Sequence, residues 1–77
     1  MEEREVMKRL YEQYSESLKK ILERIEQVEC ERSLHKAKSK EYKELYNRKR
    51  RLIKMYEDTY LWREMVKRYI QAWEEKQ

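Results

Sequence analysis

The fold is decided by the stretch from Tyr42 to Trp73, which reads YKELYNRKRRLIKMYEDTYLWREMVKRYIQAW. Apolar residues recur in it every seven positions, along three lines. The first line is Leu45, Leu52, Thr59, Val66 and Trp73, and the second is Tyr46, Ile53 and Tyr60. The third line is Tyr42, Tyr56 and Ile70, and Lys49 and Arg63 interrupt it. A seven-residue apolar repeat without glycine or proline predicts one long helix. We expect it over about residues 40–76, with Ser39 as its N-cap and Glu41 in its first turn.

A second helix is predicted upstream, over about residues 2–32. Its apolar residues alternate in steps of three and four, through Met7, Tyr11, Tyr14, Leu18, Ile21, Ile25 and Val28. This spacing is typical of a coiled-coil seam about three heptads long. Leu10 and Leu22 flank the seam and widen the apolar stripe, which favours a bundle.

The seam stops after Val28, and this predicts a turn over about residues 33–39. Continuing the steps leads to Arg32, His35 and Ser39, none of which is apolar. The expected fold is all-α: an antiparallel, coiled-coil-like hairpin of two helices, forming a single domain over residues 1–77. The turn has no glycine, which helix ends favour. The alternative is therefore one continuous helix of about 115 Å, at 1.5 Å per residue.

The size of the chain points to an oligomer. A chain of 77 residues seldom buries enough apolar surface to be stable without disulfides, a metal or a partner, and this one has a single cysteine and a single histidine. From Tyr60 onward the apolar arc is too wide for one neighbouring helix to cover. We therefore expect a homodimer that forms a four-helix bundle, with its interface at Tyr60, Trp62, Val66, Tyr69, Ile70 and Trp73.

Charge is distributed very unevenly along the chain. Residues 32–54 hold ten Lys and Arg against two Glu, a net charge of +8, whereas the whole chain carries only +4. Helical spacing places much of this excess on one face, away from Leu45 and Leu52. The pattern predicts binding to DNA or RNA phosphates through Lys36, Lys38, Lys40, Lys43, Arg48, Arg50, Arg51 and Lys54. Tyr42 and Tyr46 lie beside this face and would stack on bases if exposed. A solvated basic face without a ligand is the alternative.

Other classes of function have little support in the sequence. There is no Gly-rich phosphate loop and no nucleophile with a base at a usable spacing, so we expect no enzyme. Cys30, Glu31 and His35 are too few for a structural zinc site, and we expect no metal or cofactor. No apolar run approaches the roughly 18 residues of a membrane span. The acidic start Met1-Glu2-Glu3 does not resemble a signal peptide, and a free Cys30 fits a reducing compartment. These features predict an intracellular, cytoplasmic protein.

The sequence contains two helices with heptad repeats, Met7–Val28 and Leu45–Trp73, joined by a short turn. This pattern resembles the Rop-like helical-hairpin proteins of plasmids and viruses, whose familiar type binds RNA. The resemblance covers the length and the helix pattern, and no residue motif is shared. It implies a small intracellular regulator, in the host cytoplasm if the chain is viral. The composition, rich in Glu, Lys, Arg, Ile and Tyr, also resembles that of hyperthermophile proteins. An adaptor or scaffold that binds an acidic protein is the alternative function.

Overall fold

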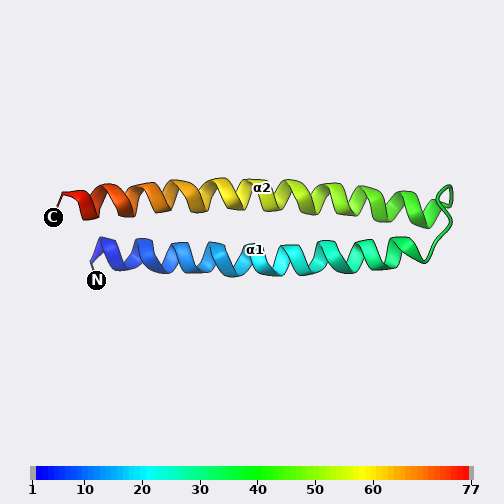
Figure 1. The fold of residues 1–77 in the computed structure, drawn as a ribbon, viewed down its shortest axis with the longest axis horizontal. Helices are drawn as coiled ribbons and strands as arrows, with labels where there is room; N and C mark the ends of the chain where they lie inside the picture. The colour runs from blue at the N-terminus through cyan, green and yellow to red at the C-terminus, as the bar shows by residue number, and fades with distance from the viewer. Residues whose placement is uncertain (1, 77) are drawn as a thin grey trace.

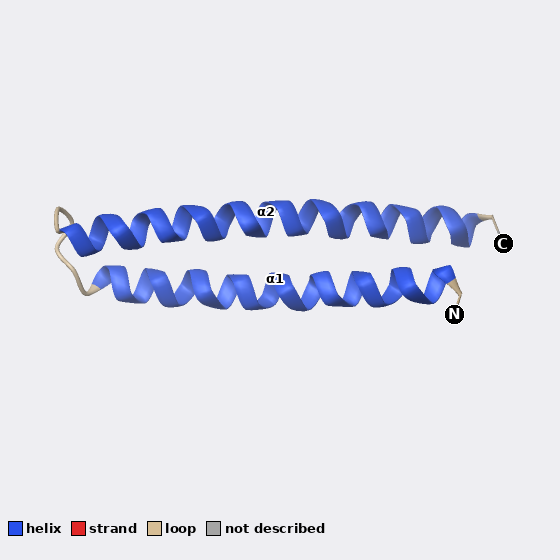
Figure 2. Cartoon of the chain, turned by 180° about the vertical axis from the view of Figure 1, so that it is seen from behind, coloured by secondary structure: helices blue, strands red, loops and turns tan. Residues whose placement is uncertain are grey.

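The computed structural model describes residues 2–76 and contains two long helices. Helix α1 spans Glu3–Ser33 and helix α2 spans Lys40–Glu75. They run antiparallel along their whole length, so that both ends of the chain lie at one end of the hairpin and the turn lies at the other (Figures 1 and 2). The Cα atoms extend over 58 × 15 × 15 Å. The predicted all-α hairpin is confirmed, and the continuous helix is excluded.

The turn forms without glycine because both helix ends use ordinary backbone conformations. Leu34 caps the C-terminus of α1 with a right-handed backbone conformation, and its N–H donates to the Glu31 carbonyl. The Ser39 side chain accepts a hydrogen bond from the Tyr42 N–H at 3.2 Å, which confirms Ser39 as the N-cap of α2. Its hydroxyl also donates to the Lys36 carbonyl at 2.8 Å. No residue among 2–76 takes a positive φ angle, so glycine has no special advantage here.

The apolar core is a narrow seam between the two helices. Its most buried side chains are Leu18, Ile21, Val28 and Leu52, each exposed by 9% or less. Ile25, Leu45 and Tyr56 pack against the cluster that Ile21, Val28 and Leu52 form. The core residues of α1 all belong to the predicted seam. No side chain among residues 2–76 is completely buried, because two helices cannot enclose one another.

Charged side chains occupy the seam at the two places where the third apolar line of α2 is interrupted. Near the turn, Lys49 Nζ lies 2.9 Å from Glu29 Oε1, and Arg32 Nη1 lies 3.2 Å from the same oxygen. The hydrogen bond from Lys49 and the charges of Arg32 and Lys49 hold the pKa of Glu29 below its ordinary value. Glu29 is therefore ionised at neutral pH and shared by two cations.

The second interruption is Arg63, in the half of the hairpin that contains the two chain ends. Its guanidinium donates to Ser15 Oγ at 3.4 Å and lies over the rings of Tyr11 and Tyr60, 5.5 and 5.4 Å from their centroids. Among residues 2–76, the only carboxylate that forms an ion pair with it is that of Glu64, at 3.9 Å, close to the outer limit for such a contact. A cation–π contact of this kind contributes roughly 0.5–1 kcal/mol at an exposed site.

The open end of the hairpin is held by polar contacts between the first turn of α1 and the last turns of α2. Arg4 pairs with Glu74 at 3.3 Å. Tyr69 donates from its hydroxyl to Glu3 Oε1 at 3.2 Å, and this hydrogen bond raises the pKa of Tyr69. Neither α1 nor α2 contains a segment apolar enough to cross a membrane.

Candidate nucleic-acid interface

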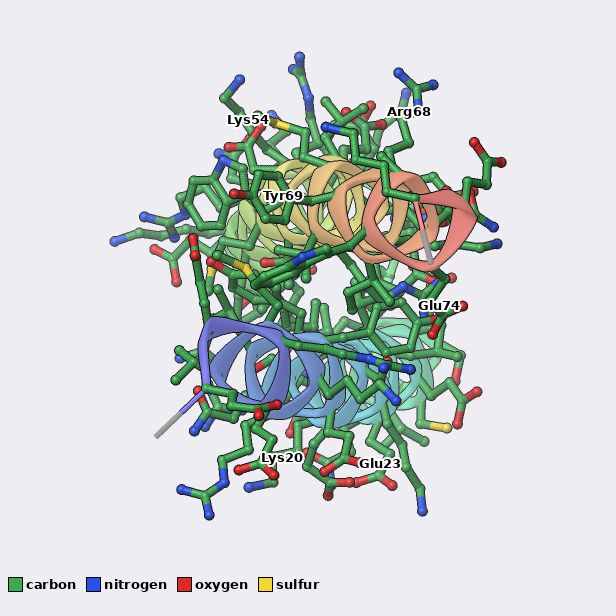
Figure 3. All side chains as sticks on the ribbon, turned by 90° about the vertical axis from the view of Figure 1, so that its left-hand side faces the viewer. Lys20, Glu23, Lys54, Arg68, Tyr69 and Glu74 are labelled. Carbon is green, nitrogen blue, oxygen red and sulfur yellow. The ribbon has the colours of Figure 1, made fainter. Side chains whose placement is uncertain are left out.

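The predicted basic residues lie in the turn and on α2, where Arg48 is on the flank next to α1 and Lys54 is on the outer face. All eight are exposed: Lys36, Lys38, Lys40, Lys43, Arg48, Arg50, Arg51 and Lys54. We call this set the basic surface. In Figure 3, Lys54 projects from α2 on the side away from α1, whereas Lys20 and Glu23 project from α1 in the opposite direction. The core residues Leu45 and Leu52 fix this orientation, because they turn the other face of α2 towards α1.

None of the basic surface residues forms an ion pair within residues 2–76. The ten Lys and Arg between residues 32 and 54 therefore divide into two groups. Arg32 and Lys49 point into the seam and share Glu29, and the other eight constitute the basic surface. The structure thus leaves these eight cations without an ion-pair partner among residues 2–76.

Three shallow hollows show which of these residues lie together. The first is lined by Glu44, Asn47, Arg50, Arg51 and Lys54. The second contains Arg48 and Arg51, but also the acidic residues Glu31, Glu41 and Glu44. The three carboxylates outnumber the two arginines in that hollow. The most strongly positive part of the surface therefore surrounds Asn47, where three cations meet one carboxylate.

Lys43 lies in the third hollow, close to the turn, with Arg32, Tyr42, Tyr46 and Asn47. The Arg32 guanidinium lies over both tyrosine rings, 4.7 Å from the Tyr42 centroid and 5.3 Å from the Tyr46 centroid. The tyrosines therefore tie α1 to the start of α2. Tyr42 is half-buried, while Tyr46 keeps 45% of its surface exposed. Tyr46 is thus the more accessible ring for stacking beside the basic surface.

One cation of α1 that the sequence did not predict as a site residue adjoins the basic surface. Arg24 lines a hollow with Arg48, Gln27 and Glu31, on the flank where the two helices meet. Arg24 belongs to the part of the chain that is acidic on average, so charge counting along the sequence does not select it. Only the pairing of the helices places it next to Arg48.

The residues predicted to form an oligomer interface fall into two groups. Tyr60, Trp62 and Tyr69 are exposed by 42, 53 and 50%. Val66, Ile70 and Trp73 are half-buried. Val66 and Trp73 continue the line of Leu45 and Leu52, and Ile70 continues the line of Tyr42 and Tyr56. Trp62 also contacts the ring of Tyr14 on α1, with 6.1 Å between centroids.

Cys30 and His35 lie near the turn, and both are exposed. Among residues 2–76, no three His, Cys, Asp or Glu side chains gather in a way that could hold a metal ion.

Comparison with protein-family models, with curated proteins and with solved structures gave no match to this chain.

Proposed function

We propose that this chain is a small, non-enzymatic nucleic-acid-binding protein that contacts phosphates through the basic surface. The observation that carries the proposal is the set of eight exposed cations, none of them ion-paired within residues 2–76. In the same structure, Lys49 and Arg32 do find a carboxylate. The lack of partners on the outer face is therefore not a general property of the cations in this segment.

The dimensions of the surface fit a polyanion. Lys40 and Lys54 are 14 positions apart in α2, which corresponds to about 21 Å at 1.5 Å per residue. A duplex carries one phosphate charge per roughly 1.7 Å of its axis, so a contact of this length meets several phosphates. Binding would release condensed counterions and would weaken steeply as salt is added.

We further propose that two hairpins dimerise as a four-helix bundle. Among residues 2–76, the hairpin buries only four apolar side chains to 9% exposure or less, and it leaves Leu61, Trp62 and Met65 exposed by 59, 53 and 67%. A second hairpin would cover this surface and supply the burial that a chain of this size lacks.

An adaptor that binds an acidic protein is the second candidate function. It is favoured by the combination of uncompensated charge with an exposed apolar residue at the turn, Leu34, whose surface is 83% exposed beside Lys36 and Lys38. Protein interfaces commonly have an apolar centre with a polar rim, whereas binding to phosphates needs no apolar contact.

Fluorescence anisotropy with labelled duplex DNA, duplex RNA and single-stranded oligonucleotides at low salt tests the proposal. Wild-type protein is expected to bind at least one of them. Replacing Arg48, Arg50, Arg51 and Lys54 with Gln is expected to weaken that binding at least tenfold. The matched control replaces Lys8, Arg9, Lys19 and Lys20, which are exposed cations of α1, with Gln. It lowers the net charge equally and is expected to retain most of the affinity. Equal losses in both variants, or no binding by the wild type, would refute the proposal.

A further inference from the structure

A second apolar stripe runs along one flank of the hairpin, outside the seam. On α2 it comprises Met55, Trp62, Met65 and Tyr69, exposed by 50, 53, 67 and 50%. Their spacing of seven, three and four places them on one face of the helix. The hydrogen bond between Tyr69 and Glu3 fixes the side of α1 that adjoins this face. Val6, three residues after Glu3 and 44% exposed, extends the stripe onto α1. We call these five residues the flank patch.

Helix α1 leaves the flank patch largely open because it packs against a different face of α2. That face carries Leu45, Leu52 and Tyr56, which belong to the core. Met55 and Tyr69 are 14 positions apart, so the patch is about 21 Å long at 1.5 Å per residue. Monomeric proteins rarely expose a continuous apolar stripe of large side chains, and such a stripe commonly marks an interface.

Charge divides the hairpin into two unlike halves. The turn half, residues 19–54, holds 13 Lys and Arg against 6 Glu, a net charge of +7. The terminal half, residues 1–18 and 55–77, holds 7 Lys and Arg against 10 Asp and Glu, a net charge of −3. Two copies that pack with their turns together would place one +7 half beside another. Two copies with their turns at opposite ends would place each +7 half beside a −3 half.

We infer that the flank patch binds the flank patch of a second copy, with the two turns at opposite ends of the dimer. A two-fold interface joins a surface to itself, so the axis passes near the middle of the patch, at Trp62. Residue 50 of one copy then lies level with about residue 74 of the other, because each is 12 positions from residue 62. The basic surface of each hairpin therefore lies beside the acidic last turn of its partner, which contains Glu74 and Glu75.

This arrangement has a consequence for nucleic-acid binding, which rests on the proposed function. The part of the basic surface that lies on α2 is centred near Asn47, 15 positions from Trp62. The corresponding parts of the two copies are then separated by about 45 Å along the bundle, at 1.5 Å per residue. The dimer would present two separate phosphate-binding surfaces, one near each end, instead of a single continuous one.

The native Cys30 provides a direct test, since it is exposed and is the chain's single cysteine. Glu29 pairs across the seam with Lys49, so Cys30 lies level with about Arg48. Spin labels on Cys30 in the full-length dimer are expected to be about 40–50 Å apart, from 14 positions on each side of the axis at 1.5 Å each. Turns at the same end would bring the labels within about 30 Å, given hairpins 15 Å wide.

A pair of exposed substitutions tests which flank is used. Met65→Glu introduces a charge into the flank patch, whereas Ile53→Glu introduces one at an exposed apolar residue, 37% accessible, outside it. Sedimentation equilibrium is expected to show at least a tenfold weaker dimer for Met65→Glu and little change for Ile53→Glu, with helical circular dichroism retained in both. A wild-type monomer at micromolar concentration, a short spin-label distance, or the reverse order of the two variants would overturn the inference. None of these measurements involves nucleic acid, so they stand or fall separately from phosphate binding.

Discussion

Lys49 on α2 forms an ion pair with Glu29 on α1, with 2.9 Å between Nζ and Oε1. This contact crosses the seam where an apolar residue would otherwise complete the heptad line of α2. Because Arg32 also contacts Glu29 at 3.2 Å, the carboxylate joins both helices close to the turn. A polar contact in a largely apolar seam favours one register of the two helices, because a shift of either helix separates the pair.

The Glu29 contact predicts a pH dependence of stability. The contact with Lys49, together with the charge of Arg32, lowers the pKa of Glu29 in the folded state below its ordinary value. Glu29 therefore stabilises the fold above its unfolded pKa, and this contribution is lost as the pH falls through the lowered folded pKa. Between pH 6 and pH 3, wild type is expected to lose more stability than Glu29→Gln, measured by urea unfolding at one protein concentration. Glu26→Gln, at an exposed site on α1, serves as the control and is expected to behave like wild type.

Arg63 is expected to cost stability, in contrast to Lys49. It lies in the seam with only a hydroxyl, two rings and a carboxylate at 3.9 Å around it. Arg63→Met is expected to raise the unfolding free energy by about 1 kcal/mol, since an apolar side chain of similar length avoids the desolvation of the charge. Arg68→Met, on the outer side of α2 (Figure 3), is expected to change little. A lower melting temperature for Arg63→Met at equal protein concentration would contradict this prediction.

The core seam predicts a contrast between two adjacent aliphatic residues of α1. Ile21 is 8% exposed and Leu22 is 46% exposed. Ile21→Ala is expected to destabilise the protein by roughly 2–5 kcal/mol, because it leaves a cavity in the seam. Leu22→Ala removes a similar volume from the surface and is expected to cost much less. Chemical denaturation followed by circular dichroism measures both changes, and similar costs would show that the seam is not the main core.

The cap of α2 predicts a smaller but specific effect. Ser39→Ala removes the acceptor for the Tyr42 N–H and the donor to the Lys36 carbonyl. The loss is expected to be about 1 kcal/mol. Ser33→Ala is the matched control: this serine donates to the Cys30 carbonyl but caps no helix N-terminus. Thermal unfolding of the two variants should rank Ser39→Ala as the less stable.

The helices and the turn could be predicted from the sequence because the signals that determine them are local. The seam from Met7 to Val28 and the N-cap at Ser39 depend on residues within a few positions of one another. The partners of Lys49 and Arg63 could not be predicted in this way. In the sequence these two residues only interrupt an apolar line, whereas their contacts with Glu29 and Ser15 depend on the register across the seam.

The same distinction applies to the candidate site. The basic surface is visible in the sequence because it lies along one helix and its turn. The sequence alone does not show that Arg24 adjoins the basic surface, or that Arg32 and Lys49 lie in the seam. Both facts follow from the pairing of the two helices. Whether the remaining cations meet phosphate depends on a partner that lies outside the chain.

The salt dependence of nucleic-acid binding tests phosphate recognition by the basic surface most directly. The logarithm of the association constant of wild type for duplex DNA is expected to fall linearly with the logarithm of the salt concentration. Arg50→Gln, in the hollow around Asn47, should reduce the magnitude of the slope by about 0.9 for the phosphate contact that it removes. Lys20→Gln, on the opposite side of the hairpin (Figure 3), should leave the slope unchanged. A wild-type affinity that does not depend on salt, or equal slopes for wild type and Arg50→Gln, would contradict phosphate recognition by this surface.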